Sequence, residues 1–196
     1  MSIGICIPAR DTVHTGFARS LSNLTARLTK QNIAFNVHWV LGSVICNSRT
    51  QLVVESLEAN HTHTMWLDSD MHFPPSVVED LLTHDKDIVA ASYSTRYLPA
   101  KSVAFTDPNN IDRRLTAKTG LHDVWAVGMG CMLVKNSVYN LLPKPWFSHH
   151  YNPEYNDFSG EDIWFCNQAN NHGIQVWVDA DLSQKIGHFG TKAFVL

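Results

Sequence analysis

Apolar runs of strand length alternate with segments of helical periodicity along the first half of the chain. The first apolar run, residues 3–9, is followed by residues 16–31, in which apolar residues recur at the spacing of one helical face. The further predicted strands are residues 34–42, 63–68 and 87–93, and the further predicted helices are residues 48–60 and 74–85. This alternation predicts an α/β fold, with a mostly parallel central sheet and helices on both faces.

The second half of the chain adds strands and helices of the same kind. Residues 124–141 predict a strand, a Gly-Met-Gly turn, a second strand and a helix. Residues 156–173 predict a helix, for which Ser159 is a possible N-cap. Residues 174–182 predict a further strand.

Length, composition and charge limit the class of protein. The chain has 196 residues, of which 44% are hydrophobic and 17% charged, enough for one sizeable core and too few for two ordinary domains. We therefore expect one domain, residues 1–196. The 15 Lys and Arg residues and 18 Asp and Glu residues give a formal charge of -3, which excludes a global field that would attract nucleic acid or an anionic membrane.

The cysteines and the first residues bear on the cellular compartment. The four cysteines are far apart and mostly lie in apolar runs, which is typical of reduced core thiols and lacks the close pairs of a zinc knuckle. The first residues carry no basic leader, and Pro8, Arg10 and Asp11 end the short apolar stretch. The sequence therefore predicts no signal peptide and no membrane span, and we expect a cytoplasmic protein.

Asp68 and Asp70 stand one residue apart at the end of the third predicted strand. In an open α/β sheet, ligands bind beyond the carboxyl ends of the strands. Two carboxylates in this position can offer oxygen ligands to a divalent cation and to the hydroxyl groups of a ligand. The structural alternative is a strand end with solvated acids, one of which caps the next helix.

Two further candidate sites lie in the second half. Glu161 and Asp162 fall in the first turn of a predicted helix, where the helix dipole favours acids, so a purely structural role carries equal weight. His188 lies between Gly187 and Gly190, which suggests an imidazole that a bent backbone presents to a site.

Taken in order, these motifs resemble a known class of enzyme. They are DSD after an apolar strand, then GMGCMLV, PWF, GEDIWFC, HGIQVWVDADL and IGHFG. The ordered set resembles the GT-A class of glycosyltransferases, in particular small family-2-like members, over nearly the whole chain. Residues 65–91 are also similar to the donor-binding half of fungal Golgi mannosyltransferases of the Anp1 type. The resemblance implies a single-domain, Rossmann-like GT-A fold that moves a sugar from a UDP- or GDP-sugar to an acceptor hydroxyl.

The resemblance also implies a metal and donor site. Asp70 and His188 would bind a divalent cation, Mn2+ or Mg2+, that bridges the diphosphate of the donor, and Asp68 would contact the ribose or reach the metal through water. Such a cation stabilises the charge that develops on the leaving group. Gly130 would border the sugar and the acceptor. The other residues that the resemblance places at the donor are Pro8, Ala9, Arg10 and Arg49.

The same resemblance also implies a catalytic role for the acids of the GED motif. In inverting members Asp162 would be the catalytic base, and Glu161 would position hydroxyl groups of the donor or acceptor. An acceptor hydroxyl must lose its proton as it attacks, and a positioned base contributes on the order of 10²–10⁴-fold to the rate.

The donor base and the acceptor stay open. Many family-2 enzymes end the second strand in an acid that reads uracil, and residues 40–49 contain none, so a base other than uracil stays possible. Contacts with the acceptor, a saccharide, a protein or a nucleic acid, would come from residues 93–118 and 147–160, which are polar and aromatic. A basic cluster is usually solvated surface, although a nucleic acid or a phosphorylated acceptor would use it. Its members here are Arg113, Arg114 and Lys118.

Two other classes of protein are compatible with parts of the pattern. A non-catalytic nucleotide-sugar or carbohydrate-binding protein could use the same pocket. A phosphatase of the haloacid dehalogenase type also carries D-x-D, but after its first strand and followed by Thr, whereas here position 72 is His. In the enzyme, residues 148–160 are expected to close over the site and exclude water; a rigid loop packed by aromatic residues is the alternative. Those aromatic residues are Tyr151, Tyr155 and Phe158.

Overall fold

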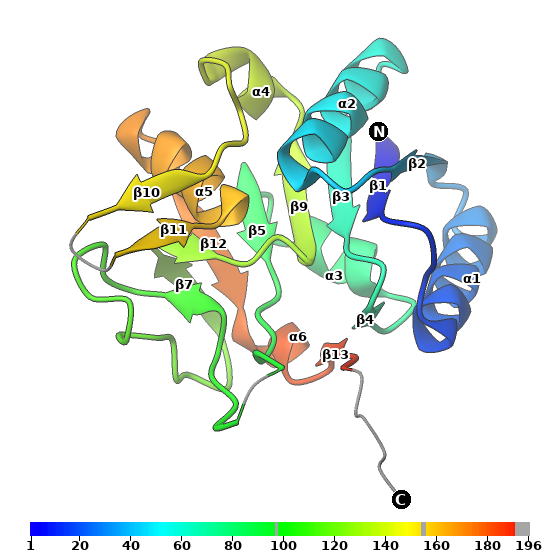
Figure 1. Ribbon diagram of the computed structural model, residues 1–196. Helices are drawn as coiled ribbons and strands as arrows, with labels where there is room; N and C mark the ends of the chain where they lie inside the picture. Colours follow the sequence, from blue (N-terminus) through cyan, green and yellow to red (C-terminus); the bar gives the residue numbers. More distant parts are fainter. Residues whose placement is uncertain (97, 154–155, 191–196) are drawn as a thin grey trace, which may run out of the picture.

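A seven-stranded sheet forms the centre of the structure, a computed structural model that describes residues 1–96, 98–153 and 156–190 (Figure 1). Its strands lie in the order β2-β1-β3-β9-β5-β12-β7. Their bounds are β1 (Ser2–Ala9), β2 (Ala34–Leu41), β3 (His63–Leu67), β5 (Ile88–Ala90), β7 (Leu121–Val124), β9 (Cys131–Lys135) and β12 (Val176–Asp179). The four strands predicted in the first half are therefore confirmed, and so is the strand predicted within residues 174–182.

The directions of the strands confirm a mostly parallel sheet. β1 pairs in parallel with β2 and β3, and β12 pairs in parallel with β5. β9 lies antiparallel between β3 and β5, and β7 lies antiparallel to β12 at the edge. Hence β1, β2, β3, β5 and β12 share one direction. β9 runs the other way, and the chain enters it from β8 (Ala126–Val127) through the short turn at residues 128–130.

Helices cover both faces of the sheet, as predicted. Buried residues of α1, α3 and α6 share one core cluster with Ile5 and Met65, and those of α2, α4 and α5 share the other with Cys6 and Trp66. Because successive side chains of a strand point to opposite faces, these neighbours mark the two faces. The bounds of the helices are α1 (Thr15–Lys30), α2 (Ile45–Glu58), α3 (Val77–Leu82), α4 (Ser137–Leu141), α5 (Glu161–Asn171) and α6 (Ala180–Ser183).

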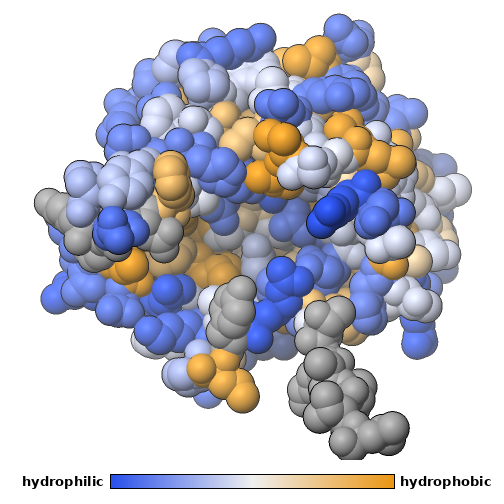
Figure 2. Space-filling view, viewed as in Figure 1, coloured by the Kyte–Doolittle hydropathy of each residue, from blue (hydrophilic) through white to orange (hydrophobic). Residues whose placement is uncertain are grey.

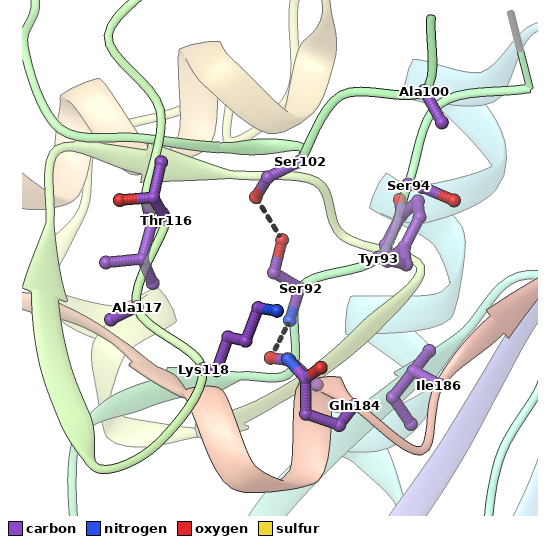
Figure 3. A pocket seen from close by; sticks show the side chains of 12 residues that line it. Ser92, Tyr93, Ser94, Ala100, Ser102, Thr116, Ala117, Lys118, Gln184 and Ile186 are labelled. Carbon is purple, nitrogen blue, oxygen red and sulfur yellow. Dashed lines mark hydrogen bonds between the residues drawn. The ribbon is translucent and has the colours of Figure 1, made fainter. Parts of the chain in front are cut away.

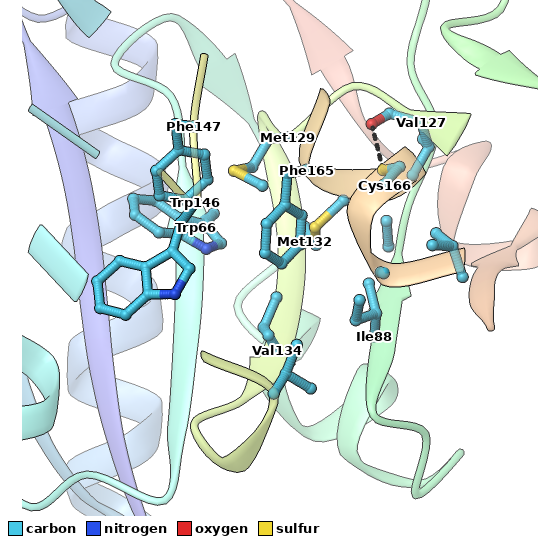
Figure 4. Packing of buried hydrophobic residues seen from close by; sticks show 14 of the residues in the cluster. Trp66, Ile88, Val127, Met129, Met132, Val134, Trp146, Phe147, Phe165 and Cys166 are labelled. Atoms are coloured by element: carbon cyan, nitrogen blue, oxygen red, sulfur yellow. Dashed lines mark hydrogen bonds between the residues drawn. The ribbon is translucent and has the colours of Figure 1, made fainter. Parts of the chain in front are cut away.

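The core cluster beneath α5 is rich in aromatic side chains (Figure 4). Trp66 meets Phe147 edge to face, with ring centroids 5.7 Å apart, and Phe147 stacks on Phe165 of α5 at 5.5 Å. Trp66 Nε1 also donates a 2.9 Å hydrogen bond to Tyr139 Oη. Since Trp66 precedes the DSD acids and Phe165 follows the GED acids, this packing holds the two acidic segments in a fixed relation.

Three short antiparallel ladders lie outside the main sheet. They pair β4 (Met71–His72) with β13 (Gly187–His188), β6 (Ala104–Phe105) with β8 (Ala126–Val127), and β10 (His150–Asn152) with β11 (Asp157–Ser159). The first ladder brings the end of the chain back to the DSD motif, because His188 pairs with Met71.

The segment expected to act as a lid, residues 148–160, contains the hairpin of β10 and β11. The rings of Tyr151 and Phe158 lie 5.3 Å apart there and both side chains are exposed, whereas Tyr155 lies outside the described residues. The expected N-cap at Ser159 is wrong. Ser159 belongs to β11, and Gly160 is the N-cap of α5 without a side-chain hydrogen bond. The closing movement itself stays a prediction.

The state of the cysteines is the one that the sequence predicts. All four cysteines lie within the described residues and are unpaired, and Cys6, Cys131 and Cys166 are buried. Burial raises the pKa of the Cys131 and Cys166 thiols to about 12, so both are inert core groups at neutral pH. In the described part of the chain, each helix is too short or too polar to cross a bilayer.

Candidate active site

The DSD acids lie in the turn between β3 and β4, at the carboxyl end of β3 (Figure 1). The backbone N–H of Asp68 donates a 3.1 Å hydrogen bond to the carbonyl of Gly130, so the turn before β9 lies directly against the motif. Figure 2, drawn in the same view, shows a hollow in the middle of this face, bordered by both hydrophilic and hydrophobic side chains. The acids are thus at the edge of the sheet where α/β proteins bind ligands.

Asp68 belongs to a buried ion-pair network around Arg49 of α2. Arg49 Nη2 donates a 2.9 Å hydrogen bond to Asp68 Oδ1, and Arg49 Nε donates a 2.9 Å hydrogen bond to Glu161 Oε1. The guanidinium also lies over the ring of Trp66, 5.2 Å from its centroid. We call Arg49, Asp68 and Glu161 the Arg49 network. It joins the end of β3 to the start of α5, two segments far apart in sequence.

Burial and charge oppose each other in the Arg49 network. Burial alone would lower the pKa of Arg49, but the carboxylates of Asp68 and Glu161 outweigh it and raise that pKa. Burial raises the pKa of Asp68, with Arg49 acting in the opposite direction. Arg49 was expected to bind the donor; its side chain is only 3% exposed and its nearest partners are these two carboxylates. Its first role is therefore to hold two acids in place.

Asp162 lies beside this network at the first turn of α5. Its Oδ1 accepts a 2.8 Å hydrogen bond from the backbone N–H of Ile163. A Cβ atom at Gly160 would lie only 2.4 Å from Asp162 Oδ1, so the carboxylate uses the space that this glycine leaves. Burial, followed by the charge of Glu161, raises the pKa of Asp162 to about 6. A carboxylate with such a pKa is a stronger base at neutral pH than an exposed aspartate.

Asp70 faces away from this network and meets His188. His188 Nε2 lies 3.5 Å from Asp70 Oδ2, and His188 Nδ1 donates a 3.0 Å hydrogen bond to the carbonyl of Ser94. That bond places a proton on Nδ1, and hydrogen bonding to Asp70 raises the pKa of His188, so Nε2 also carries a proton toward the carboxylate, and this proton must leave before Nε2 binds a cation. The backbone N–H of Phe189 donates to the carbonyl of Asp70 at 2.9 Å, which fixes the approach of the two strands. We call Asp70 and His188 the Asp70 pair.

The Asp70 pair fits a cation that a bound phosphate would share. A carboxylate oxygen and a neutral imidazole nitrogen are both suitable ligands of Mn2+. The described residues contain no cluster of three or more His, Cys, Asp or Glu side chains able to hold a metal. Asp68, expected near the metal, instead accepts from Arg49. Cations at nucleotide sites are commonly bound through one or two side chains together with phosphate oxygens and water, so two ligands suffice.

Two site residues, Tyr93 and Arg96, were expected only as part of the acceptor segment, residues 93–118, and not at the donor site. Tyr93 Oη accepts a 3.2 Å hydrogen bond from the backbone N–H of Gly130, and a Cβ atom at Gly130 would lie 2.8 Å from that oxygen. Gly130 is therefore required by the close approach of Tyr93. Arg96 Nη1 donates a 2.7 Å hydrogen bond to Asp70 Oδ2. Both residues follow β5, and their place after the carboxyl end of a predicted strand was the signal that could have revealed them.

The remaining predicted donor residues lie at the end of β1. Pro8 and Ala9 are buried there, and Arg10 is exposed. The carbonyl of Ala9 accepts a 3.0 Å hydrogen bond from Gly42 N, so the loops after β1 and β2 lie together. Their contact with a nucleotide stays a prediction.

The sequence of the first half decides the family. The profile of the Anp1 family matches residues 19–123, which is more than half of the chain. The chain belongs to the Anp1 family. The matched range of this Anp1-family chain includes Arg49, Asp68, Asp70, Tyr93 and Arg96, whereas the GED acids and the histidine of β13 lie beyond it and join the site through the fold.

Solved structures similar to this Anp1-family chain identify the fold. The crystal structure of A197 from STIV matches with 17% identity and a TM-score of 0.67, covering 97% of this chain and 87% of that one. A mutant Drosophila beta-1,4-galactosyltransferase 7, in complex with manganese, UDP-Gal and xylobiose, matches with 12% identity and a TM-score of 0.53, covering 97% of this chain and 71% of that one. The fold is that of the GT-A glycosyltransferases, and together with the family it supports glycosyl transfer as the general activity.

Proposed function

We propose that this protein is a metal-dependent glycosyltransferase that moves a sugar from a nucleotide-diphosphate sugar to an acceptor hydroxyl. One observation carries the proposal. The Asp70 pair, suited to a cation, and Asp162, whose pKa is raised to about 6, lie at the same edge of the sheet, where Arg49 joins their sequence neighbours Asp68 and Glu161. Donor activation and acceptor deprotonation need these two kinds of group within one site.

Asp70 and His188 would hold Mn2+ or Mg2+, which when bound neutralises the charge of the diphosphate leaving group. Arg96 gives a second positive charge at the same carboxylate. The Arg96 side chain is half exposed, so little free energy is lost when its guanidinium leaves Asp70 and binds a phosphate oxygen of the donor. Pro8, Ala9, Arg10 and Gly130 would border the nucleotide and sugar.

Asp162 would take the proton of the acceptor hydroxyl. As the acceptor oxygen bonds to the anomeric carbon, the bond from that carbon to the diphosphate oxygen breaks, and the proton moves to the Asp162 carboxylate. This is the role of the base in an inverting transfer. Glu161 would hold α5 in register with β3 through Arg49, so that the carboxylate of Asp162 keeps its position.

UDP- and GDP-sugars are the proposed donors, and a saccharide, a protein or a nucleic acid the proposed acceptor, for an enzyme that works in the cytoplasm. The phosphatase alternative has no support, since Asp68, which would be its nucleophile, is neutralised by Arg49. A binding protein without turnover stays as the second candidate, because the same residues could hold a nucleotide sugar.

A donor screen tests the proposal. UDP-, GDP- and dTDP-sugars are each incubated with the protein and Mn2+, and released nucleotide is measured. We expect one nucleotide class to be hydrolysed slowly, with loss of release in Asp70→Ala and upon chelation of the metal. Binding of a donor without any release, with or without candidate acceptors, would favour the binding protein.

A further inference from the structure

A cavity of about 490 Å³ opens beside the Asp70 pair (Figure 3). Three segments that are distant in sequence contribute to its lining: residues 92–94 after β5, residues 115–118 before β7, and residues 183–186 at the end of α6. The volume lies within the range of pockets that bind small molecules. None of the residues predicted from the sequence to bind donor or metal lines it.

Hydroxyl groups dominate the polar lining of the cavity. Ser92 Oγ and Ser102 Oγ lie 2.8 Å apart, and the backbone N–H of Ser92 donates a 2.8 Å hydrogen bond to Ser183 Oγ. Thr116 and Gln184 add a further hydroxyl and an amide. The described residues that line the cavity include no carboxylate. This lining matches a ligand that has several hydroxyl groups and no positive charge.

Lys118 supplies the charge at the cavity. In Figure 3 its side chain reaches toward Ser92 and Gln184, and in the described part of the chain no carboxylate forms an ion pair with it. Lys118 is exposed, so its ammonium group is solvated until a ligand binds; over a lining free of carboxylates it favours an anionic group on that ligand.

The other members of the basic cluster are engaged elsewhere. Arg113 lies 3.7 Å from Asp107, and Arg114 donates to the carbonyl of Ser102 while its guanidinium covers the ring of Phe105 at 4.4 Å. A nucleic acid would need several free cations along its backbone. Within the basic cluster, and in the part of the chain that the structure describes, Lys118 is the member whose side chain has neither an ion pair nor a hydrogen bond, which favours a small anionic ligand over a nucleic acid.

Two residues connect the cavity to the candidate active site. Tyr93 lines the cavity, while its hydroxyl accepts from Gly130 and its ring lies 5.0 Å from the ring of His188. Ser94 also lines the cavity, and its carbonyl accepts the hydrogen bond of His188 Nδ1. A ligand held in the cavity would thus adjoin the Asp70 pair, as an acceptor must adjoin the donor.

We propose that this cavity binds the acceptor, and that the acceptor is a sugar that carries a phosphate or carboxylate group, which Lys118 binds. The inference rests on the proposed function, because it assigns the acceptor side of that reaction. The hydroxyl groups of the cavity would bind the sugar, and Lys118 would select for the anionic substituent.

Binding to the full chain tests this without turnover. A hexose phosphate, a hexuronate, the neutral hexose and inorganic phosphate are each titrated while backbone amide signals are followed by NMR. We expect the first two to shift the signals of Ser92, Ser102 and Thr116, and one of them to identify the anion. The neutral hexose and inorganic phosphate should each bind about tenfold more weakly, since each lacks half of the contacts.

Variants locate the site. Lys118→Ala should weaken binding of the charged sugar by about tenfold, and Ala117→Phe, which fills the cavity without a change of charge, should abolish it. Lys30→Ala, at the exposed end of α1, is the matched control and should bind as the native chain does.

Any of the following results would overturn the assignment: equal binding of neutral and charged sugars, binding that Lys118→Ala and Ala117→Phe leave unchanged, or shifts of these signals by UDP or GDP in place of sugars. Tighter binding of a single-stranded oligonucleotide at the same residues would overturn it in favour of a nucleic-acid acceptor. Stabilisation by Mn2+ and nucleotide, measured separately, should persist in Lys118→Ala, so failure of the acceptor site is distinguishable from failure of the proposed function.

Discussion

The two acids of the DSD motif lie one residue apart and have opposite surroundings. Asp68 belongs to the Arg49 network, in which the arginine side chain is 3% exposed and ties two elements together. Asp70 faces His188 and Arg96, and the Arg96 side chain is 50% exposed. Burial raises the pKa of Asp68, whereas at Asp70 hydrogen bonding to His188 and the nearby charges outweigh burial and lower the pKa. Asp68 is held by buried partners that stabilise the fold, whereas Asp70 has more exposed partners that a ligand can replace.

The largest expected effect is a loss of stability when the Arg49 network is broken. Arg49→Met leaves the carboxylates of Asp68 and Glu161 without their cation, and should lower the free energy of unfolding by about 3 kcal/mol or more. Chemical denaturation measures this loss. Arg19→Met, an exposed arginine of α1, is the matched control and should change stability by less than about 0.5 kcal/mol. Equal effects of the two substitutions would mean that the network contributes nothing to the fold.

Asp162→Asn separates chemistry from structure within the GED motif. If Asp162 is the base, transfer should fall by about 10²-fold or more while donor affinity stays near native. Single-turnover transfer and nucleotide binding measure the two quantities. Asp123→Asn, on the exposed face of β7, should retain transfer. An Asp162→Asn variant with native transfer would rule out the base.

The pH dependence follows from the raised pKa of Asp162. Transfer should fall as pH drops through about 6, because the base becomes protonated. Stability should change in the opposite sense. The native state binds the Asp162 proton more tightly than the unfolded chain, whose value is 3.8, so this residue makes the protein less stable as pH rises from about 4 to about 6. Asp162→Asn should remove this slope, and an unchanged slope would contradict the assigned pKa.

The smallest expected effect on stability comes from removing the ion pair between Arg96 and Asp70. Arg96→Ala removes a half-exposed ion pair and should change the free energy of unfolding by less than about 1 kcal/mol. The affinity for Mn2+ should increase, because the cation no longer competes with the guanidinium for Asp70. Titration of Mn2+ by electron paramagnetic resonance measures it, and weaker binding would show that Arg96 supports the cation site.

Local patterns predicted much of the fold. The apolar run before Asp68 and the alternation of strands and helices predicted β1, β2, β3 and β5 and the helices α1, α2 and α3 between them, because these features depend on neighbours in sequence. The antiparallel insertion of β9 between β3 and β5 could not be read in this way, since it depends on pairing between strands that are far apart in sequence.

The sequence predicted which residues form the site better than it predicted the contacts between them. Both acidic motifs and His188 were found, and the family resemblance supplied the meeting of Asp70 with His188. The bridge from Asp68 to Glu161 through Arg49 was not predicted, because it depends on how α2 and α5 pack on one face of the sheet. Tyr93 and Arg96 were expected only within the acceptor segment, and their contacts with Gly130 and Asp70 were not predicted, because no periodicity marks individual residues of an irregular segment.

The central claim is that the Asp70 pair is the cation and diphosphate site, while the Arg49 network supports it. The most direct measurement is the thermal stability of the protein with Mn2+ and a donor nucleotide, in the native chain and in Asp70→Ala and His188→Ala. A ligand that binds the native state raises apparent stability, so the native chain should show a shift. Both variants should lose the shift while unfolding normally without ligand. A full shift in either variant would contradict the claim for that residue.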